Sequence, residues 1–129
     1  MEIPLYAFDF LLKLVEKGYK PIIAHPERYN SIQHNLYILD RLVDIGCVLQ
    51  MNAGSLLGLY GKPAKKVAKF MIKNCKLHII GSDAHNNNKR PFLIGKVYNK
   101  IHSKEFKEYL MKNTKNIWND DKIDLFKFF

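Results

Sequence analysis

Long apolar runs are missing from this sequence, and no basic, apolar and small-residue leader opens it. A membrane-spanning helix needs about 20 consecutive apolar residues, so the sequence predicts a cytoplasmic protein without membrane insertion. Cysteine is scarce as well, since only Cys47 and Cys75 are present. We expect both to be reduced, partly buried thiols.

The positions of the two cysteines exclude one class of enzyme. A cysteine-dependent phosphatase needs an arginine about six residues after its nucleophile, because one loop must hold both the thiolate and the phosphate. Ala53 and Gly81 occupy the corresponding positions after Cys47 and Cys75. Either thiol is therefore a poor candidate for a nucleophile.

Length and charge limit the remaining possibilities. The chain has 129 residues and 47% hydrophobic content, which predicts one domain with a real core. Its formal charge of +9, from 21 Lys and Arg against 12 Asp and Glu, favours an anionic partner, such as a phosphorylated or acidic protein. Nucleic acid is disfavoured, because the basic residues are mostly lysines scattered along predicted helices rather than a compact cluster of arginines and aromatics.

Apolar spacing alternates between the strand and helix periods over the first two thirds of the chain. The predicted elements are a strand end at 1–5, a helix at 6–17, a strand at 20–24, a helix at 36–45, a strand at 47–51, a helix that begins at 62 and a strand at 77–80. This order is typical of a parallel α/β sheet or barrel, in which the loops after the strands share one edge.

Beyond residue 90 the pattern predicts helices only. Two short amphipathic helices are expected at 94–101 and 105–111, with a further turn at 113–118. The tail, residues 123–129, mixes apolar residues with lysines, so we expect it to pack on a neighbouring part of the fold.

One strand end carries a pattern suited to a metal and a phosphate. Asp83 and His85 follow the apolar strand, and an oxygen and a nitrogen at this spacing suit zinc, manganese or iron. Arg90 follows, and its planar guanidinium group can donate hydrogen bonds to two phosphate oxygens. The alternative is a loop in which Asp83 caps a turn and His85 is a surface residue.

A second strand end repeats the pattern, with His25 after the strand at 20–24 and Arg28 three residues later. Two strand ends that each deliver an imidazole and an arginine favour a single site for a metal and a phosphate. Glu2 is either a further ligand or a frayed terminal residue. Asn52 either lines the site or forms a turn before Gly54.

Three other histidines receive no role. His34 and His102 lie near predicted helix ends and are expected to be exposed. His78 alternates with Leu77 and Ile79, so we interpret it as a hydrogen-bonded sheet residue.

Taken together, these residues resemble the C-terminal half of the PHP (polymerase and histidinol phosphatase) superfamily, and above all its CpsB/CapC branch of bacterial metal-dependent protein-tyrosine phosphatases. The segments that carry the resemblance are Glu2-Ile3-Pro4, residues 24–29 with His25-Pro26-Glu27-Arg28-Tyr29, residues 50–56, residues 81–86 with Asp83 and His85, Arg90, and residues 113–118.

The resemblance implies a distorted, TIM-like (β/α)7 barrel, of which residues 1–129 would form a partial PHP domain. It implies Glu2, His25, Asp83 and His85 as metal ligands, and Arg28 and Arg90 as catalytic residues that bind the phosphate. The metal would be Mn²⁺, with Mg²⁺, Fe²⁺ or Zn²⁺ as alternatives. Attack by a metal-activated hydroxide on phosphotyrosine would follow. The substrate implied is a phosphotyrosine protein, such as a bacterial tyrosine autokinase, in the regulation of capsule or exopolysaccharide synthesis.

The chain also departs from that family. Family members begin with a His-x-His motif and are about twice as long, whereas no His-x-His occurs here. A half barrel would leave a sheet edge and an apolar face unpaired, which predicts a homo-oligomer or a complementing half. The alternative function is a truncated, inactive remnant that acts as a binding or interaction module.

Overall fold

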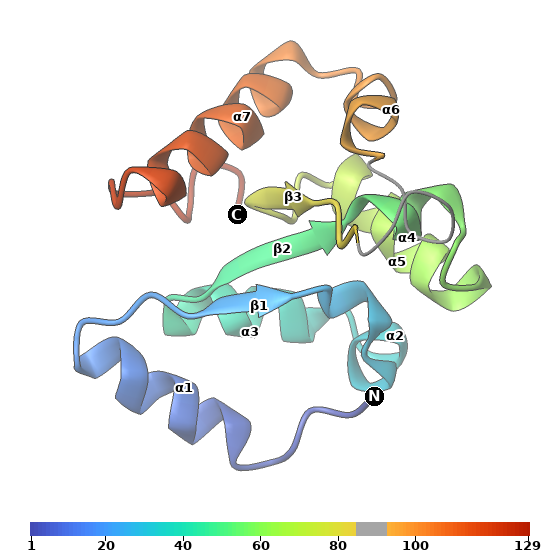
Figure 1. Ribbon diagram of the computed structural model, residues 1–129. Coiled ribbons are helices and arrows are strands. Elements are labelled where there is room, and N and C mark those ends of the chain that lie inside the picture. Colours follow the sequence, from blue (N-terminus) through green and yellow to red (C-terminus); the bar gives the residue numbers. More distant parts are fainter. Residues whose placement is uncertain (85–92) are drawn as a thin grey trace.

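A parallel three-stranded sheet lies at the centre of the protein, as the computed structural model shows for residues 1–84 and 93–129 (Figure 1). The strands are β1 (Ile22–Ala24), β2 (Val48–Asn52) and β3 (Ile79–Gly81), in the order β1-β2-β3. Ile23 pairs with Leu49 in the first ladder, and Met51 pairs with Ile80 in the second. The predicted parallel α/β arrangement is therefore confirmed, and all three strands end at the same edge.

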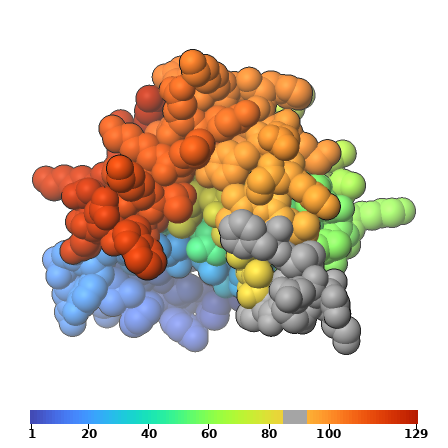
Figure 2. Space-filling view, turned by 45° about the horizontal axis from the view of Figure 1, so that its top comes forward, coloured from blue at the N-terminus to red at the C-terminus, as the bar shows by residue number. Residues whose placement is uncertain are grey.

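Helices connect and cover the strands. Before and between the strands lie α1 (Ala7–Glu16), the 3-10 turn η1 (Pro26–Arg28), α2 (Asn30–His34), α3 (Tyr37–Ile45), α4 (Ala53–Leu57) and α5 (Lys62–Lys73); α6 (Ile94–Tyr98) and α7 (Lys104–Trp118) follow. Helix α3 packs against β2, and α7 packs against β3. In the space-filling view, α6 and α7, drawn orange to red, cover most of the face turned to the viewer (Figure 2).

The core forms around β2, because this strand has neighbours on both edges. Leu49 and Met51 are fully buried there. Helices α3, α5 and α7 each turn an apolar stripe toward the core, as their 3.6-residue spacing predicts. The buried residues of these stripes include Leu39, Leu42, Val43, Val67, Ala68, Met71, Phe106 and Leu110.

The C-terminal segment departs in two respects from the expected elements. The helix expected at 94–101 ends at Tyr98. Residues 105–111 and 113–118 do not form separate pieces but one helix, α7, because Asn113 continues the helix and donates from its side chain to the His78 carbonyl at 2.9 Å. Ser103 caps the helix by accepting from the Phe106 backbone N–H at 3.2 Å. The Asn113 contact fixes α7 beside β3.

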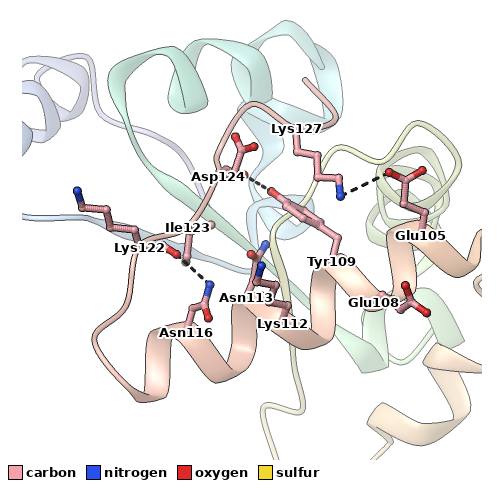
Figure 3. Close-up of a pocket in the computed structure, with 10 residues that line it drawn as sticks. All are labelled: Glu105, Glu108, Tyr109, Lys112, Asn113, Asn116, Lys122, Ile123, Asp124 and Lys127. Atoms are coloured by element: carbon pink, nitrogen blue, oxygen red, sulfur yellow. Dashed lines mark hydrogen bonds and ion pairs between the residues drawn. The ribbon is translucent and has the colours of Figure 1, made fainter.

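The tail packs back along α7, as expected (Figure 3). The Tyr109 hydroxyl donates to the Asp124 carbonyl at 2.6 Å, and Lys127 lies 3.4 Å from Glu105. Leu125 is buried. The tail therefore forms part of the fold.

The N-terminal part differs more from expectation. No strand forms over residues 1–5 of the described chain, and the Met1 carbonyl instead accepts from the Asn30 backbone N–H at 2.8 Å. Helix α1 forms as predicted but has no buried residue, and its Leu12 is 45% exposed. Residues 1–84 and 93–129 include no helix with the length and apolar content needed to cross a bilayer.

Candidate active site at the carboxyl ends of the strands

Three polar residues lie where the strands end. His25 directly follows β1, Asn52 is the last residue of β2, and Asp83 follows β3 by two positions. The His25 backbone N–H donates to the Gln50 carbonyl at 2.8 Å, which extends the β1–β2 ladder to this residue. The carboxyl ends of parallel strands form one edge of the sheet, where α/β proteins build their sites.

Asp83 is the centre of a polar cluster at this edge. Its Oδ2 atom accepts from the Asn52 side-chain amide at 3.0 Å and from the Tyr60 hydroxyl at 3.4 Å. The same oxygen lies 3.7 Å from Nη1 of Arg28, whose guanidinium carbon lies 4.4 Å from the centre of the Tyr60 ring. Residues from the loops after all three strands therefore meet at one carboxylate.

Glu27 connects the first two of these loops. Its side chain is fully buried, and Oε1 accepts from the Ser55 hydroxyl at 2.6 Å and from the Asn52 backbone N–H at 3.1 Å. Burial raises the pKa of the Glu27 carboxyl, although the hydrogen bond from Ser55 opposes the shift. A buried, hydrogen-bonded carboxyl at this place holds Arg28, its neighbour in the chain, against the end of β2.

Three buried polar atoms at the edge have no hydrogen-bond partner within the described parts of the chain, and they are His25 Nδ1, Glu27 Oε2 and Asn52 Oδ1. Unpaired buried polar atoms are rare and costly, so a group of them at one edge is evidence for a ligand. An imidazole nitrogen, a carboxylate oxygen and an amide oxygen are each donors that suit a divalent cation such as Mn²⁺ or Zn²⁺.

The backbone conformation also distinguishes this edge. His25 has φ 42° and Asp83 has φ 48°, in the left-handed region that L-residues adopt at a cost of about 1–2 kcal/mol. The described chain has two further non-glycine residues with positive φ, Cys75 and Asp120, and both lie at turns. Both His25 and Asp83 are predicted metal ligands.

Gly81 shows how closely the strand ends approach each other. A Cβ atom at this position would lie 2.5 Å from Nε2 of Gln50. A larger residue at position 81 would require the Gln50 side chain to move, two positions before Asp83.

The predicted site residues are distributed unevenly in the structure. Arg28 and Asp83 lie together, as described above. Glu2 is exposed, and its Oε2 accepts from the Ser31 hydroxyl of α2 at 2.5 Å. This contact, followed by one with Asn30, lowers the pKa of Glu2.

His85 and Arg90 fall outside the described residues. In residues 1–84 and 93–129, no three or more His, Cys, Asp or Glu side chains are grouped so that they could hold a metal. The full ligand set therefore remains a prediction.

Sequence reasoning missed part of the site. Glu27 lies inside the segment His25-Pro26-Glu27-Arg28-Tyr29, which carries the family resemblance, but nothing in the sequence indicated its own role. Ser55 stood inside the segment 50–56 without a role in the site, and Tyr60 carried no signal, because only the fold brings them to Glu27 and Asp83. Of the two interpretations of Asn52, the structure favours the one that places it in the site.

The interpretations of the other histidines are confirmed. His34 and His102 are exposed. His78 is buried, its Nδ1 accepts from the Leu49 backbone N–H at 2.9 Å, and its Nε2 lies 3.0 Å from the Leu125 carbonyl.

The cysteines are free, as expected. Burial raises the pKa of the Cys47 thiol from 9.0 to about 11, and burial, assisted by Glu105, also raises the pKa of Cys75. Both shifts oppose thiolate formation, which agrees with the exclusion of a cysteine nucleophile.

Comparison with known proteins gives consistent matches. A family model described as "Capsular polysaccharide synthesis, CpsB/CapC" matches residues 6–120. The putative tyrosine-protein phosphatase CapC of Staphylococcus aureus is 39% identical over 126 residues, which are 95% of this chain and 49% of that protein. The tyrosine-protein phosphatase YwqE of Bacillus subtilis (strain 168) is 40% identical over 90 residues, 70% of this chain and 35% of the relative.

A solved structure matches as well. It belongs to a study of YwqE from Bacillus subtilis and CpsB from Streptococcus pneumoniae, described as unique metal-dependent tyrosine phosphatases. The TM-score is 0.86 at 33% identity, over 95% of this chain and 51% of the solved chain. The chain thus spans about half the length, or less, of the relatives it matches.

Proposed function

The chain belongs to the CpsB/CapC family of capsular polysaccharide synthesis, and from this premise we propose that it forms part of a metal-dependent protein-tyrosine phosphatase. The observation that carries the proposal is the cluster of Arg28, Asn52 and Tyr60 around Asp83, beside the unpaired Nδ1 of His25. The names of the relatives support the same activity. The substrate would be a phosphotyrosine protein, such as a tyrosine autokinase linked to capsule or exopolysaccharide synthesis.

In this proposal His25, Asp83 and His85 would hold a divalent metal, with Mn²⁺ as the first candidate. Glu2, which accepts from Ser31 in the structure, would be the fourth ligand. When bound, such a metal lowers the pKa of water, so that hydroxide becomes available to attack phosphorus, and it offsets negative charge on the phosphoryl group. Asn52 keeps the Asp83 carboxylate in place by its 3.0 Å hydrogen bond.

Arg28 binds the phosphoryl group. Its Nη1 lies 3.7 Å from Asp83, which is too far for a hydrogen bond, and its flat face lies against Tyr60. The edge of the guanidinium can therefore donate two parallel hydrogen bonds to phosphoryl oxygens. Arg90 would supply the second positive charge. Both arginines stabilise the charge that spreads over the phosphoryl oxygens as the ester bond breaks.

The sheet edge supports a proposal about assembly. Ile22 of β1 is 43% exposed, and β1 has a hydrogen-bonded neighbour on one side only within the described residues. An open apolar edge is a template for further pairing. We propose that residues 1–129 are the C-terminal half of a (β/α)7 PHP barrel, and that a complementing half or a second copy covers this edge.

Metal binding is the first test, because it needs no turnover. Mn²⁺ titration followed by electron paramagnetic resonance should show a site in the wild-type chain that Asp83→Asn weakens by at least tenfold. Asp40→Asn is the matched control, because Asp40 pairs with Lys76 away from the site. Equal Mn²⁺ affinity in all three proteins would refute the proposed ligand set.

Hydrolysis of p-nitrophenyl phosphate and of a phosphotyrosine peptide is the second test. Arg28→Lys should lower kcat/KM by roughly 10- to 100-fold, because lysine keeps the positive charge but cannot donate two parallel hydrogen bonds to the phosphoryl oxygens. Arg41→Lys is the control, since Arg41 stacks at 3.8 Å on Phe8 of α1 rather than in the site. Metal binding without turnover would instead indicate that the complementing half is needed for the chemistry.

A further inference from the structure

A basic groove lies between α5 and the segment that joins α6 to α7. It measures about 680 Å³, and its lining residues are Leu56, Leu57, Lys65, Lys69, Ile72, Lys73, Asn99, Lys100 and His102. Four lysines and one histidine face it, and no carboxylate is among the lining residues. The groove therefore concentrates positive charge over an apolar floor, which consists of Leu56, Leu57 and Ile72.

Within the described residues, the four lysines of this groove form no ion pairs. In residues 1–84 and 93–129, the ion pairs formed by lysines use Lys76, Lys104 and Lys127, none of which lines the groove. Lys65 lies over the backbone of Gly58, where an added Cβ would be 3.5 Å from its Nζ. Lys69 and Lys73 are exposed on the same face of α5.

The groove between α7 and the tail provides a contrast (Figure 3). That groove, of about 600 Å³, is lined by three carboxylates and three lysines, which are Glu105, Glu108, Asp124, Lys112, Lys122 and Lys127. Its charges offset each other, so it has no preference for an anion. Only the first of these two grooves has the charge of a site for an acidic partner.

The spacing of the lysines indicates the shape of the ligand. Lys65, Lys69 and Lys73 stand four residues apart on one helix face, which places them about 6 Å apart along the axis. Alternate residues of an extended peptide recur every ~6.6 Å. Carboxylates at every second position of an extended segment would therefore match the lysines in register.

The apolar floor fits the other positions of the same peptide. Leu57 and Ile72 are half-buried in the groove, beside the buried Leu56. Side chains that alternate with the carboxylates could cover this floor. Nucleic acid suits the groove less, because it contains no arginine and, apart from His102, no ring on which bases could stack.

We propose that this groove binds an extended acidic peptide segment of a partner protein, in which acidic and apolar residues alternate. The groove begins close to the candidate active site, since Leu56 and Leu57 belong to α4, which starts directly after Asn52. The proposal concerns binding alone, so it holds or fails independently of the phosphatase activity.

Fluorescence anisotropy with a short labelled peptide in which Glu alternates with Leu tests the proposal on the whole chain. Lys69→Gln with Lys73→Gln should weaken binding at low salt by roughly fivefold, because each exposed charge pair contributes little by itself. Lys62→Gln with Lys66→Gln removes the same charge from the same helix outside the groove, and should leave the affinity within about twofold of wild type. Circular dichroism melts confirm that both variants fold.

Two further probes separate the alternatives. A peptide of the same composition, with all Glu residues in one block, should bind more weakly than the alternating peptide. A single-stranded oligonucleotide of equal charge should bind no better than the block peptide. The proposal is overturned if the wild type does not bind the alternating peptide, if both double variants lose affinity equally, or if the oligonucleotide binds more tightly.

Discussion

Ser55 donates a 2.6 Å hydrogen bond to the carboxyl group of Glu27, a residue 28 positions earlier in the chain. The same carboxyl oxygen accepts from the Asn52 backbone N–H at 3.1 Å. One buried side chain therefore joins the loop after β1 to the end of β2. The placement of Arg28, and with it the phosphate-binding part of the proposed site, depends on this contact.

Glu27→Ala should destabilise the fold by about 2–3 kcal/mol, because two buried donors lose a shared acceptor. Glu27→Gln should cost less, since the amide oxygen can still accept from Ser55. Urea unfolding measures both values, with the exposed Glu16→Ala as the control. If Glu27→Ala were no more harmful than the control, the Glu27 contacts would not hold the loops together.

Asn52→Ala should lower the free energy of unfolding by about 1–2 kcal/mol, because the buried amide no longer donates to Asp83. It should also weaken Mn²⁺ binding, since the Asp83 carboxylate would lose the shortest of the hydrogen bonds described above, at 3.0 Å. Urea unfolding and the Mn²⁺ titration check the two effects. Asn99→Ala, at an exposed position on the same chain, should change neither. A loss of stability with unaltered Mn²⁺ affinity would limit Asn52 to a structural role.

The stability of the protein should depend on pH through His78. Burial lowers the pKa of His78 below its usual 6.5, although the contact with the Leu125 carbonyl opposes the shift. The unfolded chain therefore takes up a proton at a higher pH than the folded chain. The resulting stabilisation is present above pH 6.5 and is lost as the pH falls toward the pKa of folded His78.

Melting temperatures at about pH 8 and about pH 5.5 check this dependence. The wild type should melt at a lower temperature at the acidic pH. His78→Gln should be less stable than wild type at the higher pH and should show a smaller decrease on acidification. His102→Gln, at an exposed site, should behave as the wild type. An equal decrease in all three proteins would assign the pH effect to other groups.

The activity assay should distinguish a metal-dependent mechanism from one that uses a cysteine thiol. Iodoacetamide should label the half-buried Cys75 before the fully buried Cys47, and Cys47→Ala should leave turnover unchanged. EDTA should abolish turnover, and added Mn²⁺ should restore it. Activity that resists EDTA but fails after alkylation would point to a thiol mechanism and against the proposed one. Mass spectrometry of the labelled chain identifies the cysteine that reacted.

The sequence alone predicted the strands β1, β2 and β3 and the helices α1, α3 and α5 that lie before and between them, but not the short helices α2 and α4. It also predicted that the candidate site residues lie at the carboxyl ends of these strands. Gly46 ends α3, and Pro63 lies in the first turn of α5. A glycine with positive φ and a proline with fixed φ affect only the adjacent backbone, so the local sequence is enough to place both helix ends. The polar residues at strand ends, His25 and Asp83, followed from the same local pattern.

Tertiary structure decided what the sequence could not. Glu27 is buried because the end of β2 supplies donors from residues far along the chain, and Tyr60 contacts Asp83 only because the fold brings the turn after α4 close to the end of β3. Likewise, Asn113 joins two predicted pieces into α7 because the His78 carbonyl lies within its reach. Periodicity reports which face of an element is apolar, but it carries no information about which distant donor will meet a given acceptor. Those pairings exist only once the sheet has brought the strand ends together.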